Sequence, residues 1–284
     1  MKFGSGLPIV AGGDTAALRD YVQALDDAGF DFLTTAGHIL GVPRERHADR
    51  PPATFTGPFH DPFVLFGYLA GITQRLHFRP TILILPALPT ALVAKQSAEL
   101  QQLSGGRFEL GVGISWNAVE YHALGQDFTT RGRRLEEQIQ VLRRMWGEPY
   151  VTFDGRWHRL DGVGLNRVVS PPIPIWVGAG PDERVLRRVA RVADGWIPLG
   201  DPTEALPRLR QYLTEAGRDP ASFGLTARLI LGQGGPEAWL ETARGIQTLG
   251  ATHLTLTTPP EVHGEAALKL LLEGRTALSS GLPS

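Results

Sequence analysis

Two glycine-rich turns contain the residue types best suited to hold a phosphate group or a flat ring. They are Gly111-Val112-Gly113-Ile114-Ser115-Trp116-Asn117 and Gly178-Ala179-Gly180. Each follows a strand-like segment, so bare backbone N–H groups are expected at the carboxyl end of a strand. Neither turn is specific by itself, because glycine also serves tight turns that bind nothing. Their repetition indicates a ligand site built largely from backbone.

The side chain best suited to proton transfer is His38, just after the expected second strand. An imidazole with a pKa of about 6.5 can donate or accept a proton near neutral pH. The alternative is a loop histidine bonded only to backbone. His47, His60, His122 and His158 lack metal-ligand spacing, and no H-E-x-x-H motif occurs, so we predict no metal site.

Composition excludes several other classes of function. The absence of cysteine excludes disulfides and thiolate chemistry, and neither G-x-S-x-G nor a P-loop motif occurs. With 28 basic and 29 acidic residues, the chain lacks the overall positive electrostatic field that would attract nucleic acid. No apolar run approaches ~18 residues, and the first residues lack a signal-peptide pattern. We therefore expect a cytoplasmic protein that neither binds nor spans a membrane.

Strands and helices are expected to alternate regularly along the 284 residues. The expected strands span 2–10, 29–33, 76–85, 108–113, 174–177, 195–198, 224–231 and 252–257. The expected helices span 15–28, 61–73, 90–103, 131–146, 182–193, 203–216, 236–248 and 262–273. Asp14 is the expected N-cap of the first helix. Gly29, Gly105, Gly195 and Gly250 are expected as left-handed C-caps.

Eight strand-then-helix units favour parallel strands with right-handed crossovers. We therefore predict an α/β fold, a (β/α)₈ TIM barrel forming a single domain over residues 1–284, with insertion loops and a small hairpin turning at Asp154-Gly155. A doubly wound open sheet is the alternative, but the early G-x-G lacks the acidic partner of a Rossmann frame.

The sequence resembles the luciferase-like monooxygenase superfamily from about Gly29 to Pro198. Within it, the chain is most similar to oxidoreductases that use the deazaflavin coenzyme F420. The segments that carry the resemblance are Ala94-Lys95-Gln96, Leu103-Ser104-Gly105-Gly106-Arg107-Phe108-Glu109-Leu110-Gly111-Val112-Gly113, Trp116-Asn117-Ala118-Val119-Glu120, Leu124-Gly125-Gln126-Asp127-Phe128, Arg131-Gly132-Arg133 and Ala193-Asp194-Gly195-Trp196.

The resemblance implies that the barrel holds an isoalloxazine-like ring at the carboxyl ends of its strands. The cofactor would be F420, with FMN as the alternative. A non-proline cis peptide, at Thr81-Ile82 by position, would lie against the ring. Asn117 would contact the ribityl chain or phosphate. Gly178, Ala179 and Gly180 would bind the phosphate through their backbone, at the start of the next helix.

The resemblance also gives His38 a catalytic role in the proton transfer that accompanies hydride exchange. Members of the superfamily usually place an acidic residue before this histidine, whereas this chain has Gly37. The missing carboxylate leaves the substrate class, and even activity, open. Asn117 and Glu120 would share a helix face, and Glu120 is expected at a helix terminus or on the surface.

Arginine and tryptophan residues offer further candidates. In helix 182–193, Arg184 is the best placed to reach a phosphate, whereas a solvated face explains the four arginines together. These four are Arg184, Arg187, Arg188 and Arg191. A basic loop with Arg44, Arg46 and Arg50 could hold the polyglutamate tail of a deazaflavin, or simply be solvated. Trp116, Trp176 and Trp196 could line a pocket or pack at the barrel edge.

Three functions therefore remain open. The favoured one is transfer of hydride between F420 and a small organic substrate. The alternatives are an FMNH2-dependent monooxygenase of the same superfamily and a non-catalytic flavin-binding protein. The resemblance also implies a homodimer through the second and third helices, whose apolar residues could supply the surface or could instead belong to the core. They are Phe63, Leu65, Phe66, Leu100 and Leu103.

Overall fold

The computed structural model describes residues 1–7, 14–42, 59–232 and 234–282. Eight parallel strands close into a barrel in the order β1-β10-β9-β8-β7-β4-β3-β2. This confirms the predicted (β/α)₈ barrel and excludes the open sheet. The strands are β1 (Lys2–Gly6), β2 (Phe32–Gly37), β3 (His77–Ile84), β4 (Leu110–Gly113), β7 (Ile175–Ala179), β8 (Gly195–Pro198), β9 (Gly224–Ile230) and β10 (His253–Thr257).

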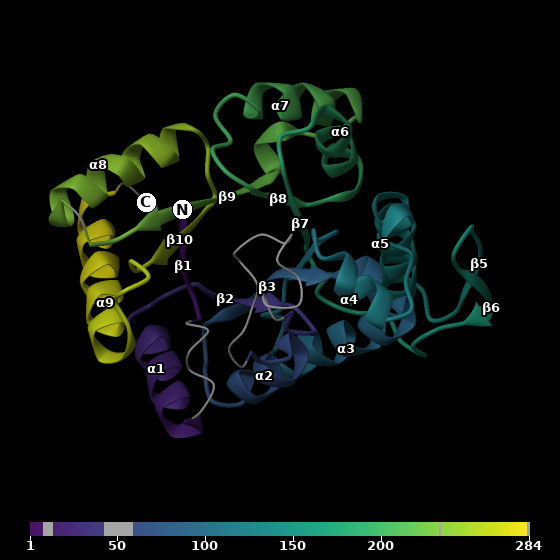
Figure 1. Ribbon diagram of the computed structural model, residues 1–284, viewed down its shortest axis with the longest axis horizontal. Helices are drawn as coiled ribbons and strands as arrows, with labels where there is room; N and C mark the ends of the chain where they lie inside the picture. Colours follow the sequence, from purple (N-terminus) through teal and green to yellow (C-terminus); the bar gives the residue numbers. More distant parts are fainter. Residues whose placement is uncertain (8–13, 43–58, 233, 283–284) are drawn as a thin grey trace.

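Helices surround the barrel, and a two-stranded hairpin stands outside α5 at the right edge of Figure 1. The helices that follow barrel strands are α1 (Thr15–Asp27), α2 (Pro62–Ala70), α3 (Thr90–Leu103), α5 (Arg131–Gly147), α6 (Glu183–Val192), α7 (Leu206–Glu215), α8 (Gly235–Thr248) and α9 (Gly264–Gly281). The hairpin consists of β5 (Val151–Asp154) and β6 (Arg159–Val163), and the short helix α4 (Ala118–Ala123) precedes α5. None of the helices within the described ranges has the length and apolar character to cross a membrane.

Aspartate side chains fix where several helices begin. The predicted N-cap is confirmed, because the Asp14 carboxylate accepts hydrogen bonds from the backbone N–H groups of Ala16 and Ala17. Asp61 caps α2 in the same way, and Asp182 caps α6. Each carboxylate satisfies amide groups that the first helical turn leaves without a partner.

Several predicted boundaries are wrong. Strand β1 ends at Gly6 rather than at Val10, and residues 8–13 lie outside the described part of the chain. Strand β2 begins at Phe32 and continues to Gly37, so His38 follows it directly. Helix α9 extends to Gly281, beyond the predicted end at residue 273. Apolar periodicity marks an element, but tertiary contacts decide where it stops.

Buried polar and aromatic side chains fill the amino-terminal end of the barrel. Arg79 is fully buried. Its guanidinium donates hydrogen bonds to the Glu109 carboxylate at 3.2 Å and to the Thr226 hydroxyl at 3.1 Å. Its guanidinium carbon lies 4.7 Å from the centre of the Phe32 ring and 4.2 Å from that of Trp176. Burial lowers the pKa of Arg79 to about 10, with Glu109 opposing this shift, so the guanidinium remains charged at neutral pH.

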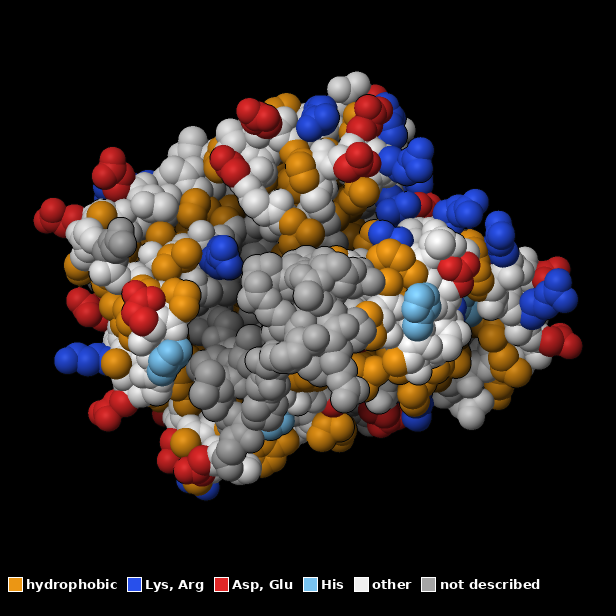
Figure 2. All heavy atoms as spheres, in the orientation of Figure 1, with side chains coloured by type: hydrophobic (Ala, Val, Ile, Leu, Met, Phe, Trp, Pro, Cys, Tyr) orange, Lys and Arg blue, Asp and Glu red, His pale blue; other side chains and the backbone are white. Residues whose placement is uncertain are grey.

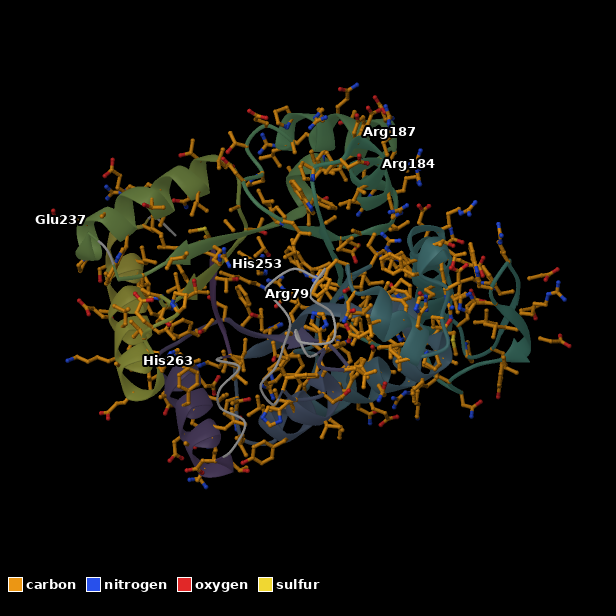
Figure 3. All side chains as sticks on the ribbon, viewed as in Figure 1. Arg79, Arg184, Arg187, Glu237, His253 and His263 are labelled. Atoms are coloured by element: carbon orange, nitrogen blue, oxygen red, sulfur yellow. The ribbon has the colours of Figure 1, made fainter. Side chains whose placement is uncertain are left out.

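His253 belongs to the same interior layer, and Figure 3 shows it beside Arg79 near the barrel axis. Its ring centre lies 4.6 Å from that of Trp176. Burial, reinforced by the charge of Arg79, lowers the pKa of His253 to about 2, so this histidine is neutral. The amino-terminal end of the barrel is therefore packed, which leaves the carboxyl-terminal end for a cavity.

Glycine residues of the neighbouring strands make room for this layer. A Cβ atom at Gly195 would lie 2.2 Å from the Trp176 ring, and one at Gly224 would lie 2.3 Å from it. Gly4 leaves equivalent space for Phe32, since a Cβ at Gly4 would lie 2.2 Å from the Phe32 ring. The prediction of Gly195 as a helix C-cap is therefore wrong, since this residue lies in β8 and its role is steric.

The other predicted C-caps are confirmed, because Gly29, Gly105 and Gly250 have φ angles of 76°, 67° and 87° after their helices. A left-handed conformation of this kind favours glycine.

Part of the surface expected to form a dimer lies inside the chain's own core. Leu65, Phe66 and Leu100 are buried, and Phe63 is half-buried against them. Leu103 at the end of α3 is exposed. The alternative that these residues belong to the core is therefore confirmed for the three that are buried, and the oligomeric state itself stays a prediction.

The steric role of Gly195 can be tested by stability. Gly195→Ala places a methyl group inside the van der Waals radius of the Trp176 ring, so we expect a loss of about 1–3 kcal/mol in the free energy of unfolding. Gly67→Ala is the matched control, because a Cβ there meets nothing within 4 Å in the interior of α2. The control should be neutral or stabilising by up to about 1 kcal/mol in urea unfolding. Equal stability of both variants would contradict the packing argument.

Candidate active site

A cavity of about 420 Å³ opens at the carboxyl ends of the barrel strands. This is where TIM barrels place their active sites, and the volume lies in the range of small-molecule pockets. Its walls are mostly apolar, with a few polar groups among them. The lining residues are Ala36, His38, Thr81, Ile82, Ile114, Ser115, Trp116, Arg131, Leu135, Val177, Gly178, Ala179, Gly180, Val185, Arg188 and Leu199.

The peptide bond between Thr81 and Ile82 is cis, as the resemblance predicted, and both residues line the cavity. The register between β2 and β3 shifts at this point, where Thr35 pairs with Pro80 and Gly37 pairs with Leu83.

The Ile82 side chain explains two of the glycines in the predicted turns. A Cβ at Gly113 would lie 2.8 Å from Ile82 Cδ1, and one at Gly178 would lie 2.5 Å from Ile82 Cγ2. Gly111 belongs to the same turn as Gly113, and a Cβ there would lie 2.0 Å from the Pro80 carbonyl oxygen. The glycines of the first turn are therefore needed for packing of β4 against β3, whatever the turn binds.

The second turn faces the cavity with its backbone. Gly178, Ala179 and Gly180 line it, and a Cβ at Gly180 would meet nothing within 4 Å. The Asp182 carboxylate already accepts from the first amides of α6, those of Arg184 and Val185. The loop backbone, rather than the first turn of α6, is thus the part that can approach a phosphate.

His38 lines the cavity and is held by a buried carboxylate. Its Nδ1 atom lies 2.7 Å from Glu120 Oε2, and its side chain is 16% exposed. The Trp116 ring, which also lines the cavity, has its centre 6.4 Å from that of His38. The two side chains form one wall of the site.

The Glu120 carboxylate accepts four hydrogen bonds and has no exposed surface. Oε1 accepts from the N–H groups of Ile39 at 2.9 Å and Leu40 at 3.1 Å. Oε2 accepts from Asn117 Nδ2 at 2.8 Å and bonds His38 Nδ1. Burial would raise the pKa of Glu120, but the bonds from His38, Leu40 and Ile39 outweigh burial and hold this pKa below its usual value.

An ionised carboxylate can only accept, so His38 Nδ1 must carry a proton toward Glu120. In the neutral ring, Nε2 is then the basic nitrogen. The interaction fixes both the tautomer and the orientation of the imidazole, as carboxylate partners do for functional histidines elsewhere.

Asn117 lies at the start of α4 and is 2% exposed. Its Oδ1 accepts from Val119 N–H at 3.1 Å, which caps the helix, and its Nδ2 donates to Glu120. Both polar atoms are therefore engaged, and the side chain is not part of the cavity lining. Direct contact of Asn117 with a cofactor stays a prediction. In the structure, its side-chain amide donates to the Glu120 carboxylate that holds His38.

Gly37 has no room for a side chain. A Cβ there would lie 2.7 Å from the Ile82 carbonyl oxygen and 2.8 Å from Leu83 Cα, both backbone atoms. Glu120 supplies a carboxylate to His38 from α4 instead. Of the two positions expected for Glu120, the helix terminus is confirmed, since it lies in the first turn of α4, and the surface position is wrong, since it is buried. Its i, i+3 spacing from Asn117 indicated a shared helix face, but not that this face is buried under the segment after β2.

The arginines and tryptophans divide between several environments. Arg188 lines the cavity and is 8% exposed, so a solvated face does not describe it. Trp116 lines the cavity, whereas Trp176 and Trp196 are buried in the barrel. Trp196 Nε1 donates to the Ala179 carbonyl at 3.0 Å. The basic loop with Arg44, Arg46 and Arg50 lies outside the described residues.

The sequence matches the luciferase-like monooxygenase family over residues 1–276, and the chain belongs to this family. An uncharacterized protein of Mycobacterium tuberculosis is 39% identical over 165 residues, 57% of each chain. The pyrimidine monooxygenase RutA of Escherichia coli is 31% identical over 175 residues, 57% of this chain and 48% of RutA. The matches thus span about half the length of these relatives.

The fold is also that of a solved structure. An F420-dependent secondary alcohol dehydrogenase, in complex with an F420–acetone adduct, superimposes with a TM-score of 0.78 over 98% of both chains, at 15% identity. At this identity the likeness concerns the fold. The family is named for monooxygenases and RutA is one, so the chain belongs to a family that contains enzymes.

Glu120→Gln should destabilise the fold in a pH-dependent way. The variant keeps the shape but loses the charge that accepts four hydrogen bonds, so we expect a loss of roughly 1.5–3 kcal/mol at pH 7. The folded pKa lies below the ordinary value of 4.5. The stabilisation is therefore complete above that pH and is lost as the pH falls through the folded pKa.

Urea unfolding from neutral pH down to about pH 3.5 would measure this difference. The gap between wild type and variant should narrow in acid. Glu148→Gln, which removes an exposed carboxylate paired with Arg144, is the control and should change stability little at any pH. A gap that is constant with pH would contradict an ionised Glu120.

Proposed function

We propose that the protein is an F420-dependent oxidoreductase that transfers hydride between the deazaflavin and a small organic substrate. The observation that carries the proposal is the His38–Glu120 pair at the wall of an apolar cavity in a luciferase-like barrel. The fold likeness to an F420-dependent alcohol dehydrogenase supports the choice of cofactor.

The residues present suit a flat, phosphate-bearing cofactor. Ile82, Ile114 and Val177 offer apolar surface to a ring. Gly180 leaves open space beside the backbone of the second turn, where a phosphate can approach N–H groups. When bound there, the deazaflavin would accept the hydride from the substrate, or supply it in the reverse direction, and the barrel would supply orientation and exclude water.

His38 would move the accompanying proton. Because Nδ1 is committed to Glu120, Nε2 would accept a proton from a substrate hydroxyl, or return it in the reverse direction. The Glu120 carboxylate would stabilise the imidazolium that results, and Asn117 would hold that carboxylate in place. Gly37 does not weaken the proposal, since the carboxylate reaches His38 from α4.

An FMNH2-dependent monooxygenase is the second candidate, and the relative that favours it is RutA. The same cavity would accept the ring of either cofactor, so the wall residues do not separate the two. Oxygen consumption with reduced FMN would support this candidate. A non-catalytic flavin-binding protein would bind a cofactor without turnover.

Cofactor titration is the first test. Tryptophan fluorescence, followed while deazaflavin coenzyme or FMN is added separately, should fall on binding because Trp116 lines the cavity. We expect deazaflavin to bind at least about tenfold more tightly than FMN, a difference of about 1.4 kcal/mol. Trp116→Phe should lose most of the signal while retaining binding by equilibrium dialysis. Tighter binding of FMN, followed by oxygen uptake, would overturn the F420 assignment.

His38→Ala should lower kcat by roughly 10²–10⁴-fold, the usual contribution of a positioned acid–base group. Oxidation of reduced deazaflavin by a panel of small carbonyl compounds, followed by absorbance, would measure it. The cofactor Kd should change little, because the apolar surface proposed to contact the ring, that of Ile82, Ile114 and Val177, is unchanged in the variant. His122→Ala, at an exposed position of α4, is the control and should keep full activity. Full activity of His38→Ala would remove this residue from the mechanism.

A further inference from the structure

A second cavity, of about 630 Å³, lies between the amino-terminal part of α5 and one side of α6 along its whole length. We call it the arginine groove. Its lining contains five arginines but one carboxylate, and Figure 2 shows basic side chains gathered over α6 and the adjoining end of α5. The lining residues are Thr129, Gly132, Arg133, Glu136, Arg184, Arg187, Arg188 and Arg191.

The groove keeps an excess of positive charge after its ion pairs are counted. Glu136 serves two arginines at once, with Oε1 2.6 Å from Arg188 Nε and Oε2 2.9 Å from Arg191 Nη2. Arg187 pairs with Glu183 of the same helix and with Glu215 of α7. Among the described residues, Arg133 and Arg184 have no ion-pair partner, and Figure 3 shows Arg184 and Arg187 projecting from α6.

Arg188 joins the groove to the active-site cavity, because it lines both. Its position is built by the fold, since a Cβ at Gly132 would lie 2.9 Å from Arg188 Nη2 and 3.3 Å from its Cζ. The guanidinium therefore occupies space that glycine leaves at the start of α5. An arginine that served only as a solvated surface residue would not need this space, and it would be far more exposed than the 8% found for Arg188.

We propose that the arginine groove binds the anionic tail of the cofactor, a chain of carboxylates joined to the ring portion through a phosphodiester. The inference rests on the proposed function and makes it more specific. With the ring in the cavity, the phosphodiester would leave past Arg188, and the carboxylates would follow Arg184 and Arg133. FMN ends at its phosphate and has no group that reaches these two arginines. The groove would therefore favour a tailed deazaflavin over FMN.

The test compares three ligands with the same protein: deazaflavin coenzyme with a long oligoglutamate tail, the deazaflavin riboside that lacks phosphate and tail, and FMN. The double variant R133Q/R184Q removes the two unpaired charges. Its control is R159Q/K269Q, which removes the same charge at exposed positions on the hairpin and α9. Fluorescence titration gives the Kd of each ligand for each protein at low salt and at about 0.5 M NaCl.

We expect R133Q/R184Q to bind the tailed coenzyme about three- to tenfold more weakly at low salt, and the other two ligands as the wild type does. High salt should remove the difference because exposed charges are screened. Unchanged binding of the tailed coenzyme, or equal weakening of the riboside, would overturn the inference while leaving the F420 assignment intact. Equal weakening of FMN would assign the groove to a phosphate and also overturn it. If no deazaflavin binds the unmodified protein, the proposed function fails and the inference falls with it.

Discussion

The buried carboxylate of Glu120 is the interaction on which the active-site wall depends. An ionised carboxylate without exposed surface is costly unless its lone pairs are used, and here four donors surround it. Three of these donors belong to the segment immediately after β2, and the fourth belongs to Asn117 of α4. One charge thus joins two segments that are about 80 residues apart and sets the nitrogen that His38 can use for chemistry.

The two ends of the barrel are built on opposite principles. At the amino end, Arg79, Trp176 and Phe32 fill the interior, and glycines on adjacent strands leave the volume that these large side chains need. At the carboxyl end, Ile82, the glycines of the second turn and side chains from the surrounding loops and helices border a cavity instead. Because protein interiors tolerate few voids, closing one end with large side chains confines the open volume to the end where the loops of the site lie.

The sequence predicted the barrel because each β/α unit carries its own local signals, such as the Asp14 cap and the glycine after α1. The resemblance located the cis bond at Thr81-Ile82. Neither the local sequence signals nor the resemblance predicted the contacts between segments that are distant in the sequence. The role of Gly195 depends on a tryptophan of the neighbouring strand, and the burial of Glu120 depends on where the chain runs after β2. Helical spacing gives a face, but it does not say what covers that face.

The arginines of α6 show how an almost neutral chain can still create a local field. The formal net charge is −1, yet five arginines and one carboxylate line the same groove. The spacing of Arg184, Arg187, Arg188 and Arg191 places them along one side of the helix, and α5 adds Arg133 across the groove. Like charges in one groove repel one another. Glu136 pairs with Arg188 and Arg191, and Arg187 pairs with two other carboxylates, which leaves Arg133 and Arg184. A bound polyanion would relieve the remainder, which gives the groove a physical reason to prefer a ligand that extends beyond the cavity.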